Sequence, residues 1–177
     1  MINFKIYNKK GGVDMTNKCN YIKRSSKYII GTAILATSLS SAAFGLDKLS
    51  YYLIKNGEDL REFAAIVNGG ETDAKGRLMD DIKLDKSKQW TPIGTRSNPF
   101  EGELMSIGGR TKAISGLYVD SKNDNQGLFG CIGCRGTVKD IKISDSYIKG
   151  EDYVGGIAGR NLGEMENCII DGDVMIK

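Results

Sequence analysis

The sequence predicts an all-β fold: a right-handed parallel β-helix-like solenoid with a short N-terminal capping helix, preceded by a helical signal peptide. Two observations carry this prediction. Glycine is dense in the second half of the chain, where 15 of the 23 glycines fall between Gly94 and Lys177. Apolar residues recur there in register, at spacings of 24 to 29 residues. Repeats of that length, built from short strands and glycine turns, are typical of solenoid coils.

Three six-residue segments carry the apolar repeat, each with apolar residues at its first, fourth and sixth positions. They are 114–119 (ISGLYV), 138–143 (VKDIKI) and 165–170 (MENCII), at successive offsets of 24 and 27 residues. A second match joins 127–130 (GLFG) to 156–159 (GIAG) at an offset of 29. A β-sandwich also has short strands and turns, but matches in register favour stacked parallel coils.

Residues 1–45 read as a signal peptide, with Met15 as an alternative start. A positive region precedes an apolar run at 28–39 (YIIGTAILATSL), and small residues suited to signal peptidase follow it. The apolar run is shorter than the roughly 20 residues that a membrane-spanning helix needs. A cleaved signal, cut before Leu46 or before Phe44, is therefore favoured over an anchor. The prediction is a secreted or cell-surface protein that meets the membrane only during export.

The basic charge of the chain belongs to this leader. The whole chain carries +3, but residues 1–45 hold seven basic residues and one acid, so the remainder has 18 basic and 21 acidic residues and a net charge of −3. This charge gives no reason to expect nucleic-acid binding. The chain has no histidine. Within it, that removes Ser-His-Asp and Cys-His catalysis and histidine-ligated zinc sites.

Residues 46–93 are predicted to form an N-terminal cap, with a helix at about 57–68 and a first strand at 77–84. Asn56 is a good helix N-cap, and glycines at 69 and 70 end the helix. One helix face is apolar, through Leu60, Phe63, Ala64 and Val67. In the predicted strand, Leu78, Ile82 and Leu84 are the expected buried positions. Adjacent Asp80 and Asp81 would point to opposite faces, so they do not form an acid/base pair.

The chain from Asn56 to Lys177 resembles the GLUG-motif repeats of bacterial surface proteins. The resemblance runs in order through EDL (58–60), VNG (67–69), WTPIG (90–94), PFEG (99–102), ISGLYV, GLFG, VGGIAG (154–159) and NC (167–168). Segment 103–109 departs from the more regular turn of the family. The resemblance assigns residues 94–177 to truncated GLUG-type repeats. It implies these structural motif residues: Trp90, Gly94, Gly116, Gly127, Leu128, Phe129, Gly130, Gly155, Gly156 and Gly159.

The resemblance also implies a function. Proteins with such repeats are exported or surface-attached, including adhesin-like proteins, and similar repeats accompany zinc peptidases that cleave immunoglobulin A. The expected function is a non-catalytic binding or adhesion scaffold without a cofactor, whose partner is a host or cell-surface protein or glycan. The alternative is the N-terminal, non-catalytic portion of a larger exported hydrolase. The sequence following Lys177 would discriminate the two.

The cysteines form the first chemical candidate. Cys131 and Cys134 make a CxxC pair, and Cys168 could add one zinc ligand, but no fourth ligand is evident. A redox motif would need a helix N-terminus, whereas this pair follows a predicted turn. In an exported protein, a local disulfide between Cys131 and Cys134 or inert thiols are favoured.

Two charged segments are the other candidates. Segment 120–127 (DSKNDNQG) is rich in oxygen ligands, but Lys122 falls where a calcium loop needs a ligand, which favours a solvated turn. Lys139, Asp140, Lys142 and Asp145 could line one face, as in pectate-degrading β-helices. Alternating charge on the solvent side of half-buried strands explains them without a substrate.

The last segment, 174–177, reads as part of a strand with no polar cap after it. A solenoid needs about three coils and protected ends to be stable. Residues 46–177 expressed alone should therefore be marginally stable or self-associate, as measured by light scattering and thermal melting. A monodisperse monomer with a cooperative melt would contradict this expectation.

Overall fold

The computed structural model describes residues 51–177, and the predicted signal peptide lies outside the described residues. The described chain is a β-solenoid in which all strand pairs are parallel. Its helical elements are the α-helix α1 (Gly57–Asn68) and the short 3-10 turn η1 (Ile107–Gly109). No helix within residues 51–177 is long and apolar enough to cross a membrane.

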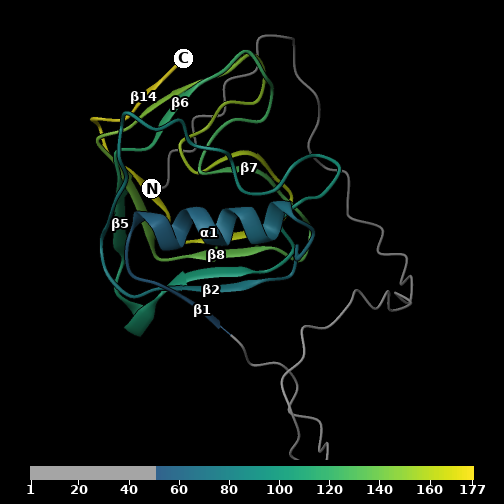
Figure 1. Ribbon diagram of the computed structural model, residues 1–177, viewed down its shortest axis with the longest axis vertical. Helices are drawn as coiled ribbons and strands as arrows, with labels where there is room; N and C mark the ends of the chain where they lie inside the picture. Colours follow the sequence, from purple (N-terminus) through teal and green to yellow (C-terminus); the bar gives the residue numbers. More distant parts are fainter. Residues whose placement is uncertain (1–50) are drawn as a thin grey trace, which may run out of the picture.

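Four stacks of strands form the walls of the solenoid (Figure 1). The first contains, in order, β1 (Tyr51–Ile54), β2 (Lys75–Leu78), β4 (Glu103–Ser106), β8 (Thr137–Lys139) and β12 (Glu164–Glu166). The second contains β3 (Ile82–Lys83), β5 (Lys112–Ser115), β9 (Ile141–Ser144) and β13 (Ile169–Ile170). The third contains β6 (Tyr118–Asp120), β10 (Tyr147–Lys149) and β14 (Met175–Ile176), and the fourth pairs β7 (Phe129–Ile132) with β11 (Ala158–Asn161). Pairing of β2 with β4 and of β3 with β5 crosses the predicted boundary at residue 94.

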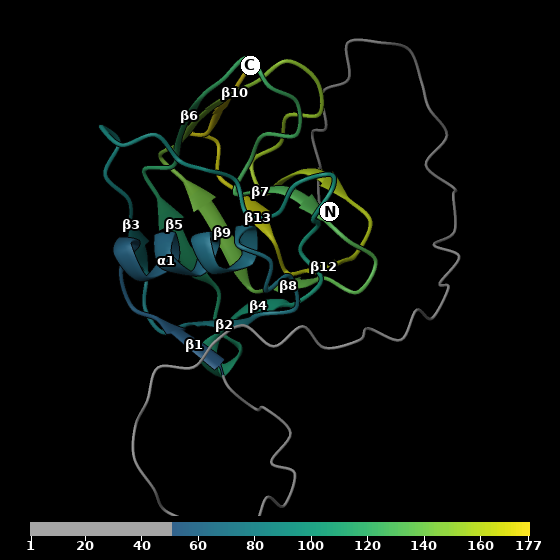
Figure 2. The ribbon, with the colours of Figure 1, turned by 45° about the vertical axis from the view of Figure 1, so that its right-hand side comes forward.

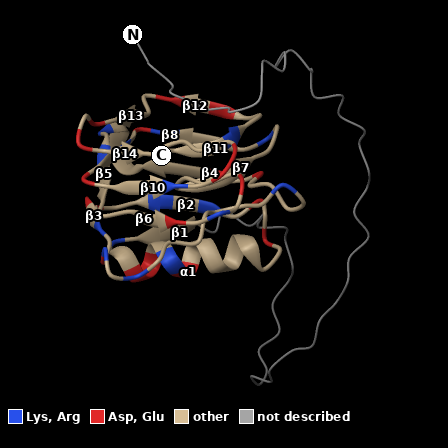
Figure 3. Cartoon of the chain, turned by 90° about the horizontal axis from the view of Figure 1, so that it is seen from above, with Lys and Arg blue, Asp and Glu red and all other residues tan. Residues whose placement is uncertain are grey.

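Helix α1 lies at one end of the stack, with β12 toward the other end (Figure 3). The Asn56 side chain accepts hydrogen bonds from the backbone N–H groups of Glu58 and Asp59, at 2.9 and 3.0 Å. These bonds satisfy donors that the first turn leaves unpaired. The apolar face is buried against the coils, through Leu60, Phe63, Ala64 and Val67. The predicted capping helix is thereby confirmed, with its bounds.

A chain of aromatic rings connects α1, drawn in front of the stacked strands in Figure 2, to the core of the solenoid. Phe63 on α1 contacts Phe100 with ring centroids 6.1 Å apart, and Phe100 contacts Phe129 on β7 at 5.1 Å. Tyr52 on β1 adds an edge contact to Phe63 at 5.8 Å. The helix therefore shares one hydrophobic core with the coils.

The repeat registers are confirmed in two cases and wrong in one. Val138 pairs with Met165 and Ile143 with Ile170, at the predicted offset of 27, and Phe129 pairs with Ala158 at 29. The predicted offset of 24 between 114–119 and 138–143 is wrong, because Ile114 pairs with Ile143. Segment 114–119 and segment 138–143 turn two successive corners, so the same apolar pattern occurs on different walls.

The predicted strand at 77–84 is also wrong as a single element. It is two strands, β2 and β3, joined by a bend at Asp80. Leu78, Ile82 and Leu84 are buried as expected, because the bend preserves their inward orientation. Asp81 Oδ1 accepts a hydrogen bond from the Ala113 N–H at 2.9 Å, which ties this corner to the next coil.

Candidate binding groove

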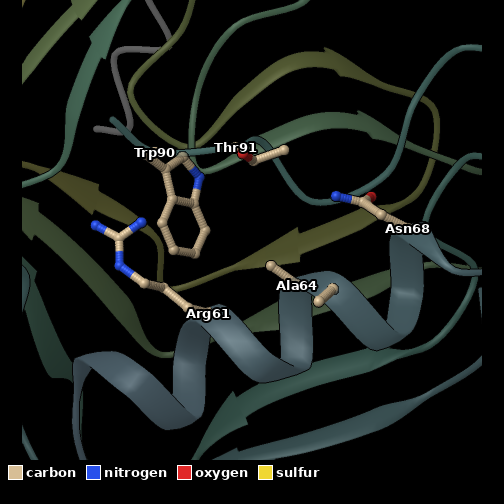
Figure 4. A pocket seen from close by; sticks show the side chains of 6 residues that line it. Arg61, Ala64, Asn68, Trp90 and Thr91 are labelled. Atoms are coloured by element: carbon tan, nitrogen blue, oxygen red, sulfur yellow. The ribbon is translucent and has the colours of Figure 1, made fainter. Parts of the chain in front are cut away.

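Two adjoining hollows lie at the helix end of the solenoid. The first has a volume of about 240 Å³ and lies between α1 and the loop at Trp90 (Figure 4). The second, of about 390 Å³, continues from there to the loop at 123–126. Asn68 and Thr91 line both hollows, so together they form one groove. We call this the helix-end groove.

One wall of the apolar half of the groove is a single face of α1. Arg61, Ala65 and Asn68 recur at i, i+4 and i+7, so they share one helix face. The Trp90 side chain is only 2% exposed, and its Nε1 donates to the Leu128 carbonyl at 3.1 Å. The Arg61 guanidinium covers the indole ring at 5.5 Å and donates to the carbonyls of Lys88 and Gln89. This half therefore has a fixed shape.

Asn68 connects the helix to the Trp90–Gly94 loop. Its Nδ2 donates to the Pro92 carbonyl at 3.0 Å, and its Oδ1 accepts from the Gly94 N–H at 2.8 Å. Ile93, between them, pairs with β7. The side-chain amide thus makes the two bonds that a neighbouring strand would make along this edge.

The Asn68→Asp variant tests this connection. A carboxylate keeps the acceptor but cannot donate to the Pro92 carbonyl, so we expect a loss of about 1–3 kcal/mol in the free energy of unfolding. Urea denaturation measures it. The control is Asn98→Asp, at an exposed position whose side chain makes no hydrogen bond within residues 51–177, and a change within about 0.5 kcal/mol is expected there. Equal effects of the two variants would contradict the proposed connection.

The structure places the predicted motif residues in turns and in the core rather than in the groove. Only Trp90 and Gly94 line it. Leu128 and Phe129 are fully buried. Gly94 has a φ of +72° and Gly116 a φ of +76°, a region that side chains disfavour. At the remaining five glycines, an added Cβ would lie closer than 3.0 Å to a neighbouring atom. They are Gly127, Gly130, Gly155, Gly156 and Gly159.

Of the two alternatives predicted for the CxxC pair, the local disulfide between Cys131 and Cys134 is wrong, because Cys131 is a free thiol. Cys131 belongs to β7 and is 2% exposed, whereas Cys134 is exposed in the turn that follows. Cys168 is free and 4% exposed, and its thiol donates to the carbonyls of Glu166 and Val138 at 3.4 and 3.5 Å. Burial raises the pKa of both thiols, that of Cys168 to about 11. These are protonated thiols at neutral pH, with little nucleophilic character.

The Cys168 pKa predicts a pH effect on stability. An unfolded thiol loses its proton near the reference pKa of 9.0, whereas the folded one holds it up to about 11. Between these values the unfolded state binds fewer protons, so the contribution of Cys168 to stability is full below pH 9 and is lost as pH rises. Denaturation of the wild type and of Cys168→Ala across this range should converge toward high pH. Alkylation of Cys168 at pH 8 as fast in the folded protein as in denaturant would contradict the burial argument.

The predicted charged face forms ion pairs within the solenoid. Lys139 pairs with Glu166 and Glu164, at 2.7 and 3.2 Å, and these contacts raise the pKa of the lysine. Lys142 pairs with Asp171 at 2.8 Å. The other two acids are also engaged: Asp145 accepts from Lys86, and Asp140 from the Asn167 amide. In Figure 3 the positions of basic residues (blue) and acidic residues (red) are spread along the stacked coils. These charges hold neighbouring coils and do not converge on one point.

Residues 123–126 of the predicted solvated turn at 120–127 line the groove. Asp120 pairs with Lys149 at 2.9 Å, and Asp124 Oδ1 accepts from the Asp152 N–H at 3.1 Å. Residues 51–177 contain no group of three or more Cys, Asp or Glu residues placed to hold a metal ion. Asn123 and Asn125 line the polar half of the groove, with Arg96 from the loop after Gly94. The sequence marked this segment as polar, but did not show that it faces α1.

Comparison with known proteins finds partial relatives. The chain is 35% identical over 104 residues to a protein of Evansella cellulosilytica named a putative Gly-rich membrane protein. This alignment covers 54% of this chain and 12% of that protein. It is also 27% identical over 112 residues to halomucin of Haloquadratum walsbyi, in an alignment that covers 55% of this chain and 1% of halomucin. The chain therefore spans only a small part of the length of these relatives. No protein-family profile and no solved structure matches.

Proposed function

We propose that this chain is an exported, surface-displayed repeat module of the GLUG type, which binds a ligand and has no catalytic activity. The observation that carries the proposal is the helix-end groove, a hollow on the solenoid whose apolar half is fixed by the hydrogen bonds of Arg61 and Trp90. The relatives support the location, since one is named a membrane protein and the other a halomucin. Both are much longer than this chain, as expected for a module that recurs within large surface proteins.

The charge arrangement supports binding over catalysis. Acid/base catalysis needs titratable groups that converge on a substrate. The charged groups considered as a site are instead paired along the coils, and the free thiols are buried. The groove itself offers amide, hydroxyl and guanidinium groups and a single carboxylate, Asp124, whose Oδ1 accepts a hydrogen bond from the Asp152 N–H. These groups can hold a ligand, but they are poor proton carriers at neutral pH.

Surface labelling of producing cells tests the proposal. An antibody against the folded chain should label intact cells, and brief protease treatment of intact cells should remove the signal. A cytoplasmic protein labelled in parallel controls for lysis. Labelling that appears only after lysis would overturn the proposed location. Release of peptides or sugars from surface polymers incubated with the purified protein would overturn the non-catalytic assignment.

A further inference from the structure

We propose that the helix-end groove binds an uncharged oligosaccharide, an assignment that rests on the proposed binding function and names its ligand class. Sugar rings combine apolar C–H faces with a rim of hydroxyl groups. The groove likewise has an apolar part next to a polar part. Its two hollows are lined by apolar groups of α1 and Trp90 at one end and by polar side chains at the other. The larger hollow falls within the range of about 300–1,000 Å³ that is usual for ligand sites.

The apolar half offers a surface but no free charge. Ala65 is its exposed apolar residue, and the buried Ala64 and Trp90 form the floor beneath it (Figure 4). Its one charged side chain, Arg61, is held by two backbone carbonyls and by the indole ring. An ionic group of a ligand would therefore have to break these bonds. A C–H face of a sugar can cover the exposed Ala65 methyl group without disturbing these bonds.

The polar half offers unpaired groups that match hydroxyls. Within residues 51–177 the side-chain amides of Asn123 and Asn125 and the guanidinium of Arg96 make no hydrogen bond or ion pair. An amide both donates and accepts, as a sugar hydroxyl does. One cation, Arg96, and one anion, Asp124, line this half, so its net charge is zero. That balance favours an uncharged ligand over an acidic one.

The edge beside the groove is closed to an extended peptide. A peptide would add as a strand by pairing with the outward backbone groups of Pro92 and Gly94. The Asn68 side chain already occupies both, at 3.0 and 2.8 Å. A peptide ligand would have to displace this amide, whereas an oligosaccharide uses only side chains. The contacts thus favour a glycan over a polypeptide.

Isothermal titration of the full chain with maltohexaose, cellohexaose, mannohexaose and chitohexaose tests the proposal. At least one should bind with a Kd of about 1 mM or tighter. Ala65→Arg, which fills the apolar half, and Arg96→Ala should each weaken it about tenfold. The matched controls are Glu62→Arg on the same helix and Arg110→Ala, which lie outside the groove and should leave the Kd unchanged. Binding that is indifferent to the groove variants would overturn the site.

A second measurement separates the ligand class from the proposed function. Wells coated with yeast mannoprotein present both polypeptide and glycan. Binding that is lost after periodate treatment of the coat, and kept after protease treatment, supports an oligosaccharide. The reverse result overturns the glycan while leaving a binding module intact. Absence of binding to the coat and to all four oligosaccharides also overturns the ligand class, and surface labelling then decides the proposed location independently.

Discussion

Replacing Phe100 by alanine should lower the free energy of unfolding by about 3–5 kcal/mol, the range for buried aromatic side chains. Phe100 is fully buried and lies between Phe63 and Phe129, at 6.1 and 5.1 Å. It is one of the contacts through which the capping helix and the coils share their core. Because small domains are stable by only about 5–15 kcal/mol, this loss would remove a large part of the total.

The measurement is denaturation followed by circular dichroism and by the fluorescence of Trp90, the single tryptophan of the chain. Phe100→Leu is the graded control. It retains much of the apolar area and loses mainly the ring–ring contacts, which contribute about 0.5–1.5 kcal/mol. Helix and coils should unfold together in both variants. A Phe100→Ala protein as stable as Phe100→Leu would show that the ring is not central to the core. A separate transition for the helix would show that the core is not shared.

The sequence was sufficient for the fold class because a solenoid repeats its own pattern. Matches at offsets of 27 and 29 correspond to strands that do stack. The false offset of 24 arose because the corner between β5 and β6 and the corner between β8 and β9 share one pattern. In each, an apolar residue is followed two positions later by a left-handed residue and then by two more apolar positions. Gly116 and Asp140 are the left-handed residues, with φ of +76° and +57°.

The correct partner of segment 114–119 was present in the sequence. Segment 143–148 (ISDSYI) matches ISGLYV at an offset of 29, with Ile, Ser and Tyr identical, and Tyr118 stacks on Tyr147 at 5.6 Å. The same offset joins GLFG to GIAG. Agreement between two offsets within one coil is therefore a better guide to register than apolar spacing alone.

The groove could not be predicted in the same way. Its walls come from α1, from the loop after Trp90 and from the turn at 123–126, which are brought together by the register of the coils. Asn68 read only as the end of a helix, since the sequence does not show that Pro92 and Gly94 lie beside it. The disulfide was wrong for a related reason: CxxC spacing is compatible with a bridge, but Cys131 is in a buried strand and Cys134 in an exposed turn.

Replacing Gly102 by alanine should destabilise the protein by about 1–3 kcal/mol or more through overpacking, although alanine in an ordinary position would be neutral or stabilising. Gly102 precedes β4 and lies over Ala74 of the preceding coil. An added Cβ would collide with the Ala74 carbonyl oxygen and would lie 2.8 Å from the carbonyl carbons of Ala74 and Asp73. These are backbone atoms, so the coils would have to separate. Its φ is not in the left-handed region, which leaves steric contact as the cause.

The matched control is Gly172→Ala, where an added Cβ meets nothing within 4 Å and φ is also not left-handed. That variant should be as stable as the wild type, or more stable by about 0.4–1 kcal/mol, since alanine restricts the unfolded chain. The difference between the urea midpoints of the Gly102→Ala and Gly172→Ala proteins measures the destabilisation that comes from the close contact between coils. Gly136 and Gly163 occupy the equivalent position before β8 and β12, and their added Cβ atoms would collide with Phe100 and Gly136 carbonyl oxygens. Alanine at Gly136 should therefore reproduce the Gly102 result, and a Gly102→Ala protein as stable as Gly172→Ala would show that the spacing between coils adjusts freely.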